Sequence, residues 1–163
     1  MTRGNSMKTY ILTAGLVLSA GPALAAGAEG NGALALAAMV AAHSPSVSPA
    51  EKALLSAYLD GRPKVGFRGP RKIVVKADSV TCRISNVDIT AKSCELAFHG
   101  RTLSTYGREA QALYATLIEV GVPSSGAAGS IYEAVKRLQC TIDPAQVRQE
   151  AGGGASCNFE NAP

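Results

Sequence analysis

The chain has 163 residues and a formal net charge of +4, from 16 basic and 12 acidic side chains. This length is enough for one domain with a modest hydrophobic core. Its apolar runs fall short of the roughly 20 residues that a membrane-spanning helix needs, so the composition excludes a protein that stays anchored by such a helix.

Residues 1–25 have the pattern of a cleaved signal peptide for export. The basic residues Arg3 and Lys8 precede an apolar stretch, and the small residues Ala23 and Ala25 fit the specificity of signal peptidase. Cleavage after Ala25 leaves 138 of the 163 residues and lowers the net charge from +4 to +2. We therefore expect a periplasmic or extracellular protein, and not a lipoprotein, because no cysteine lies near the cleavage site.

Residues 26–61 are predicted to form an N-terminal helical segment. Residues 26–32 are rich in glycine and are expected to be loose, whereas the Ala- and Leu-rich residues 33–43 favour a helix. A second helix begins at Ser48, which forms a capping box with Glu51. Two such short helices cannot make a core alone.

Residues 62–71 read as a basic linker or loop rich in glycine and proline. The stretch 62–76 contains no acidic residue, one aromatic residue, Phe67, and six basic residues: Arg62, Lys64, Arg68, Arg71, Lys72 and Lys76. This stretch is a candidate site for an anionic surface, such as lipid head groups, lipopolysaccharide or an acidic partner. A solvated linker is the interpretation we favour, and we expect no nucleic-acid partner.

Residues 72–163 are predicted to form a disulfide-stabilised α+β domain. Its four cysteines are Cys82, Cys94, Cys140 and Cys157. Their separations of 12, 46 and 17 residues do not resemble the close ligand pairs of structural zinc sites, whereas an even number in an exported chain favours disulfides. A hairpin places Cys82 opposite Cys94, close enough for a disulfide, and Cys140–Cys157 follows by elimination.

Three strands in series open this domain and form a meander. The first covers residues 72–85, with an interruption at Asp78-Ser79 that we interpret as a bulge. The second covers residues 89–98, and a two-residue turn at His99-Gly100 joins it to the third, residues 101–105.

An amphipathic helix over residues 108–120 follows, and its apolar face is expected to cover the sheet. The remaining elements are a loop over 122–130, a short helix over 131–138, a strand over 139–143, one or two helical turns over 144–150 and a terminal strand over 156–160. The predicted fold class is therefore α+β: a small antiparallel sheet covered by a helix, with two short N-terminal helices.

No sequence motif identifies a catalytic residue, a metal site or a cofactor; there is neither a G-x-S-x-G elbow nor an H-E-x-x-H motif. We expect a small exported protein that binds another macromolecule, for example as an inhibitor. One alternative is a small hydrolase, which would need His43 or His99 in a concave pocket beside a carboxylate. The other is an envelope structural protein attached to anionic surfaces through residues 62–76.

Overall fold

The computed structural model describes residues 26–61, 71–85, 88, 92–122, 125–127, 130–149 and 153–161. The strands are β1 (Ala26–Glu29), β2 (Ile73–Ile84), β3 (Lys92–Phe98), β4 (Arg101–Tyr106), β5 (Ser125–Ala127), β6 (Ser130–Ile142) and β7 (Ala155–Asn161). The helices are α1 (Gly30–His43), α2 (Pro49–Leu59), α3 (Gly107–Glu119) and α4 (Pro144–Gln149).

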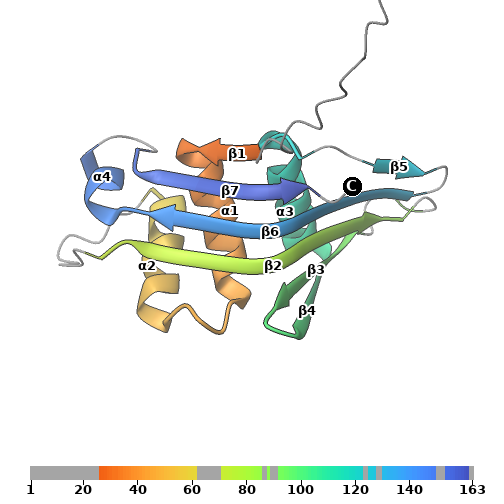
Figure 1. The fold of residues 1–163 in the computed structure, drawn as a ribbon, viewed down its shortest axis with the longest axis horizontal. Coiled ribbons are helices and arrows are strands. Elements are labelled where there is room, and N and C mark those ends of the chain that lie inside the picture. The colour runs from red at the N-terminus through yellow and green to blue at the C-terminus, as the bar shows by residue number, and fades with distance from the viewer. Residues whose placement is uncertain are drawn as a thin grey trace, which may run out of the picture.

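The strands form one antiparallel sheet in the order β1-β7-β6-β2-β3-β4, with β5 paired to β6 beside this path. Figure 1 shows α1, α2 and α3 behind this sheet, and no helix of the described residues covers its front face. This mixture of helices with an antiparallel sheet is the α+β class that the sequence predicts. No helix in the described ranges is long and apolar enough to cross a membrane.

The N-terminal helices pack on the sheet rather than on each other alone. The buried side chains of α1 and α2 belong to the same apolar cluster as those of the strands. The predicted capping box of α2 is present: the backbone N–H of Glu51 donates to Ser48 Oγ, and the Ser48 N–H donates to Glu51 Oε2 at 2.9 Å. The helical segment thus completes its core against the sheet.

The prediction that residues 26–32 are loose is wrong. Residues 26–29 form β1, which pairs with β7, and α1 begins at Gly30. The glycine-rich composition is compatible with this arrangement because a Cβ on Gly27 would lie 3.3 Å from the carbonyl oxygen of Cys157. The pairing partner lies far along the chain, so the local composition does not indicate the strand.

Two buried disulfides cross-link neighbouring strands. Cys82–Cys94 joins β2 to β3, and Cys140–Cys157 joins β6 to β7, with Cα–Cα distances of 4.1 and 4.0 Å. Each pair consists of residues directly opposite in the ladder, as the hairpin argument predicts for the first pair. Disulfides of this kind persist in oxidising compartments such as the periplasm or the extracellular space.

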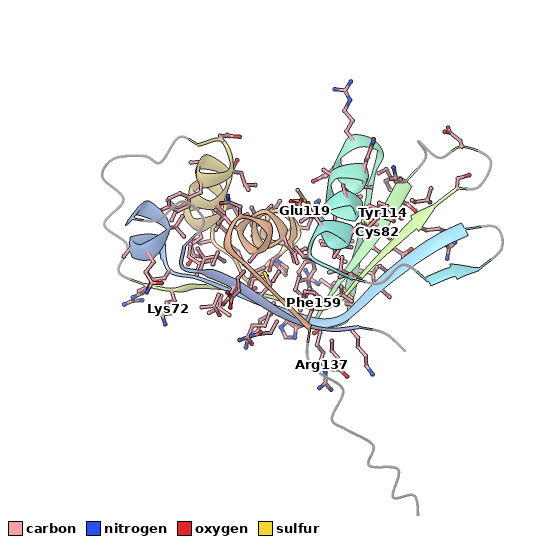
Figure 2. The ribbon with its side chains drawn as sticks, turned by 90° about the horizontal axis from the view of Figure 1, so that it is seen from above. Lys72, Cys82, Tyr114, Glu119, Arg137 and Phe159 are labelled. Atoms are coloured by element: carbon pink, nitrogen blue, oxygen red, sulfur yellow. A yellow bond between two sulfur atoms is a disulfide. The ribbon has the colours of Figure 1, made fainter. Side chains whose placement is uncertain are left out.

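The sheet bends where two central strands change which side chains face the helices. In β2 the inward residues are odd-numbered from Ile73 to Ala77 and even-numbered from Val80 to Ile84, so the alternation slips at the predicted interruption, Asp78-Ser79. Figure 2 shows the sheet bent near the labels of Arg137 and Phe159, with α1 and α2 over one part and α3 over the other.

A matching slip in β6 explains the main error of the sequence prediction. Val135 and Leu138 both face the core, and Arg137 between them has a φ of 60° in an irregular part of the β6–β7 ladder. This extra residue gives the apolar positions a spacing of three, which imitates a helix. The predicted helix over 131–138 is wrong, since β6 is one strand from Ser130 to Ile142.

Two smaller predictions also differ from the structure. The predicted loop over 122–130 contains β5, which pairs with the start of β6. The second strand is described from Lys92 onward, and residues 89–91 lie outside the described residues. The His99-Gly100 turn, α3, α4 and β7 agree with their predicted places.

Candidate functional site

A hollow of about 460 Å³ lies on the uncovered face of the sheet, at the bend. Its lining comes from β2, β6, β7 and the turn between β3 and β4, and consists of Lys76, Ala77, Asp78, His99, Arg137, Leu138, Gln139, Asn158, Phe159 and Glu160. This volume lies within the range of ligand pockets in proteins. Figure 2 shows Arg137 on the side of the sheet away from the helices.

The hollow contains both of the non-glycine residues with positive φ in the described ranges, His99 at 46° and Arg137 at 60°. His99 is the first central residue of a hairpin turn whose second is Gly100, at 80°. A turn of this type needs positive φ at both positions and favours asparagine or glycine. Residues in such sparsely populated conformations cluster at functional sites.

Arg137 is the residue with positive φ in the bulge of β6. Glycine is the residue that fits the left-handed position of a bulge without steric cost. The chain instead has a long cationic side chain there, 80% exposed, at the edge of the hollow. At two turning points of the backbone, therefore, a long polar or cationic side chain lies where glycine or asparagine would fit more easily.

The charged groups of the hollow are only partly neutralised by one another. The backbone N–H of His99 donates to Asp78 Oδ2 at 2.6 Å. Arg137 Nη1 lies 4.0 Å from Glu160 Oε2, and both side chains are well exposed, so this pair adds little to stability. The side chain of Lys76 makes no ion pair or hydrogen bond within the described part of the chain.

The lining offers charged and amide groups that can bind polar ligands. None of the lining residues carries a hydroxyl or thiol. The bond between His99 and Asp78 uses the backbone N–H, so it does not orient the imidazole as a general base. The charged and amide groups around the hollow can contact a ligand by charge and hydrogen bonds, beside the apolar residues Ala77, Leu138 and Phe159.

The other histidine also lies beside a carboxylate. His43 Nε2 is 2.8 Å from Glu109 Oε1, and the Thr105 hydroxyl donates to Glu109 Oε2 at 3.0 Å. In a catalytic triad the histidine stands between the hydroxyl and the carboxylate, whereas here the carboxylate is in the middle. Thr105 is also 97% buried. This cluster joins the C-terminal end of α1 to the N-terminal turn of α3, where the Glu109 carboxylate suits the helix dipole.

The basic stretch predicted from the sequence is not gathered into one site in the described residues. Lys76 lines the hollow, whereas Arg71 and Lys72 are exposed before β2, and Figure 2 shows Lys72 at one end of the sheet, away from Arg137. Four candidate residues lie outside the described residues, namely Arg62, Lys64, Phe67 and Arg68. The binding role of residues 62–76 stays a prediction.

A second hollow, of about 680 Å³, contains Lys72, Glu29 and Asp143 at the end of the sheet near α4. Asp143 is already engaged, because its Oδ1 accepts from the Ala145 N–H and its own N–H donates to the Gly154 carbonyl. The described residues contain no group of three or more histidines, cysteines or acidic residues that could hold a metal ion. The hollow at the bend is therefore the candidate site.

Sequence reasoning singled out Lys76 as a candidate binding residue and placed His99 in its turn, but it missed Arg137, Gln139, Asn158 and Glu160. These residues meet because β6 and β7 pair across a long sequence separation. Comparison with known proteins finds no matching protein-family model, no matching curated protein and no matching solved structure.

Proposed function

We propose that this protein is an exported binding protein that recognises another macromolecule through the hollow at the bend of its sheet. The observation that carries the proposal is the placement of His99 and Arg137. Both adopt the left-handed backbone conformation, and both line the same hollow on a face that none of the described helices covers. A conformational cost accepted twice at one place is typical of a functional site.

Binding is favoured over catalysis by the chemistry of the lining. Ammonium, guanidinium, carboxylate and amide groups surround the hollow, and no hydroxyl or thiol nucleophile accompanies them. A macromolecular partner is favoured because exposed side chains continue beyond the hollow along the same face, as at Val74 and Arg83 of β2. A partner could therefore bury the hollow together with its surroundings.

Export supports the same proposal. The signal-peptide pattern of residues 1–25 and the two disulfides both fit an oxidising compartment. N-terminal sequencing of the protein purified from its native host should begin at Ala26, the first residue of β1. Protein with an intact N-terminus in the cytoplasm would show that the export assignment is wrong.

The binding site can be tested by crosslinking in intact cells. A photoreactive amino acid at position 139 lies in the hollow, whereas one at Ala115, an exposed position on α3, lies on the opposite face. We expect a discrete crosslinked adduct from position 139 and none from position 115. Adducts from position 115 alone, or from neither position, would refute the hollow as the binding site.

A further inference from the structure

Three polar side chains form a row across the hollow. Lys76 on β2 stands directly opposite Gln139 on β6, and Gln139 stands directly opposite Asn158 on β7. All three are exposed on the uncovered face. Directly opposed side chains of neighbouring strands start about 4.5–5.5 Å apart at their Cβ atoms, so the three polar ends can reach a common ligand.

The row is rich in hydrogen-bond donors. An ammonium group carries three N–H donors, and each carboxamide carries two. No hydrogen bond or ion pair engages the side chains of Lys76, Gln139 or Asn158 within the ranges that the structure describes. Arg137 adds a guanidinium beside the row, at 4.0 Å from its nearest carboxylate. The row with Arg137 is therefore suited to an oxyanion.

The acidic groups of the hollow limit what kind of oxyanion fits. Asp78 and Glu160 also line it, so the two cations are balanced by two carboxylates. A phosphate group carries a charge of about −1.5 to −2 at neutral pH and is repelled more strongly by these carboxylates than a singly charged carboxylate. Asp78 and Glu160 can in turn accept hydrogen bonds from N–H groups next to the ligand carboxylate.

We infer that the hollow binds an acidic side chain within a peptide segment of the partner. Its carboxylate lies against Lys76, Gln139 and Asn158, and the neighbouring peptide N–H groups face Asp78 and Glu160. This inference rests on the proposed function and names the chemistry of the partner. The charged groups contribute specificity and association rate, as complementary charges do at interfaces.

The test is an NMR titration of the mature, oxidised protein with a short capped peptide rich in glutamate. The side-chain NH₂ signals of Gln139 and Asn158 report directly on the row. We expect saturable shifts of both signals, weakened by salt. In Lys76→Gln the affinity should fall about tenfold, as expected for a lost charge-assisted hydrogen bond. The control Arg108→Gln removes one charge from an exposed position on α3 and should leave the affinity unchanged.

The remaining outcomes separate this inference from the proposed function. Equal binding of the same peptide with glutamine in place of glutamate would overturn the acidic chemistry and leave the hollow as a binding site. If sodium acetate or inorganic phosphate alone shifted the Gln139 and Asn158 signals as much as the peptide does, the hollow would be a simple anion site. The inference that it binds a peptide segment would then be wrong. If the Gln139 and Asn158 signals did not shift but position 139 still gave a crosslinked adduct, only the acidic chemistry would be refuted. If the signals did not shift and no adduct formed, both proposals would be refuted.

Discussion

Replacing Arg137 by glycine tests whether the bulge of β6 is built for function rather than for stability. Arg137 has a φ of 60°, a conformation that costs a non-glycine residue roughly 1–2 kcal/mol. Glycine removes this cost but loses about 0.5–1 kcal/mol more conformational entropy on folding. The ion pair with Glu160, at 4.0 Å between exposed side chains, contributes only a few tenths of a kcal/mol.

We therefore expect Arg137→Gly to keep its stability or to gain about 1 kcal/mol. Lys136→Gly is the matched control, since Lys136 is the adjacent residue, is basic and exposed, and has no positive φ. In this position glycine has no strain to relieve, so the control should lose about 0.5–1 kcal/mol. The two variants remove the same charge, but only Lys136→Gly should lose stability.

Urea unfolding with the disulfides intact measures both variants. With a typical slope of about 1–3 kcal/mol per molar urea, a difference of 1 kcal/mol shifts the midpoint by roughly 0.5 M. If Arg137→Gly lost as much stability as Lys136→Gly, the strain at position 137 would be absent and the account of the bulge would be wrong. Arg137→Gly should also reduce the crosslink from position 139 although the protein remains fully folded.

Three further predictions concern the scaffold. Ser48→Ala should lower the free energy of unfolding by about 1 kcal/mol at neutral pH, and an unchanged value would refute the capping box. Hydrogen bonds from Ser48 lower the pKa of Glu51 from its ordinary 4.5, so the part of this stabilisation that depends on the Glu51 carboxylate should be lost as the pH falls below 4.5 through the depressed pKa, whereas the part from the bond between the Glu51 N–H and Ser48 Oγ should remain. Replacing Cys140 and Cys157 by serine should cost about 3 kcal/mol in urea unfolding; an unchanged midpoint would show that this bridge does not stabilise the fold. Gly154→Ala should cost at least about 2 kcal/mol, because Gly154 has a φ of 74° and its Cβ would lie 2.5 Å from the nearest side-chain carbon; unchanged thermal unfolding would exclude this packing.

The features that the sequence predicts well depend on short-range patterns. The capping box between Ser48 and Glu51 joins residues three apart, and the turn at His99-Gly100 follows from two adjacent residues. The Cys82–Cys94 pairing depends on one hairpin with regular alternation. In each case the physical interaction lies between residues that are near each other in the chain, so the sequence contains the whole signal.

The features that the sequence does not predict depend on distant strands or on a break in alternation. Pairing of β1 with β7 brings together residues 26–29 and 156–159, and no local pattern indicates this contact. The slip at Arg137 changes which residues of β6 face the core, so the spacing of apolar residues misleads. The same slip places Arg137 at the hollow, which is why the candidate site and the mispredicted element coincide.

The order of the disulfides along the chain matters for oxidation if the chain is exported as we propose. Cys82 pairs with Cys94 before Cys140 is reached, so the two covalent loops follow one another and do not overlap. A chain that crosses the membrane from its N-terminus presents the first pair to the oxidising side before the second. The first cysteine of each pair can then join the next cysteine to arrive, and neither bridge has to be broken to form the other.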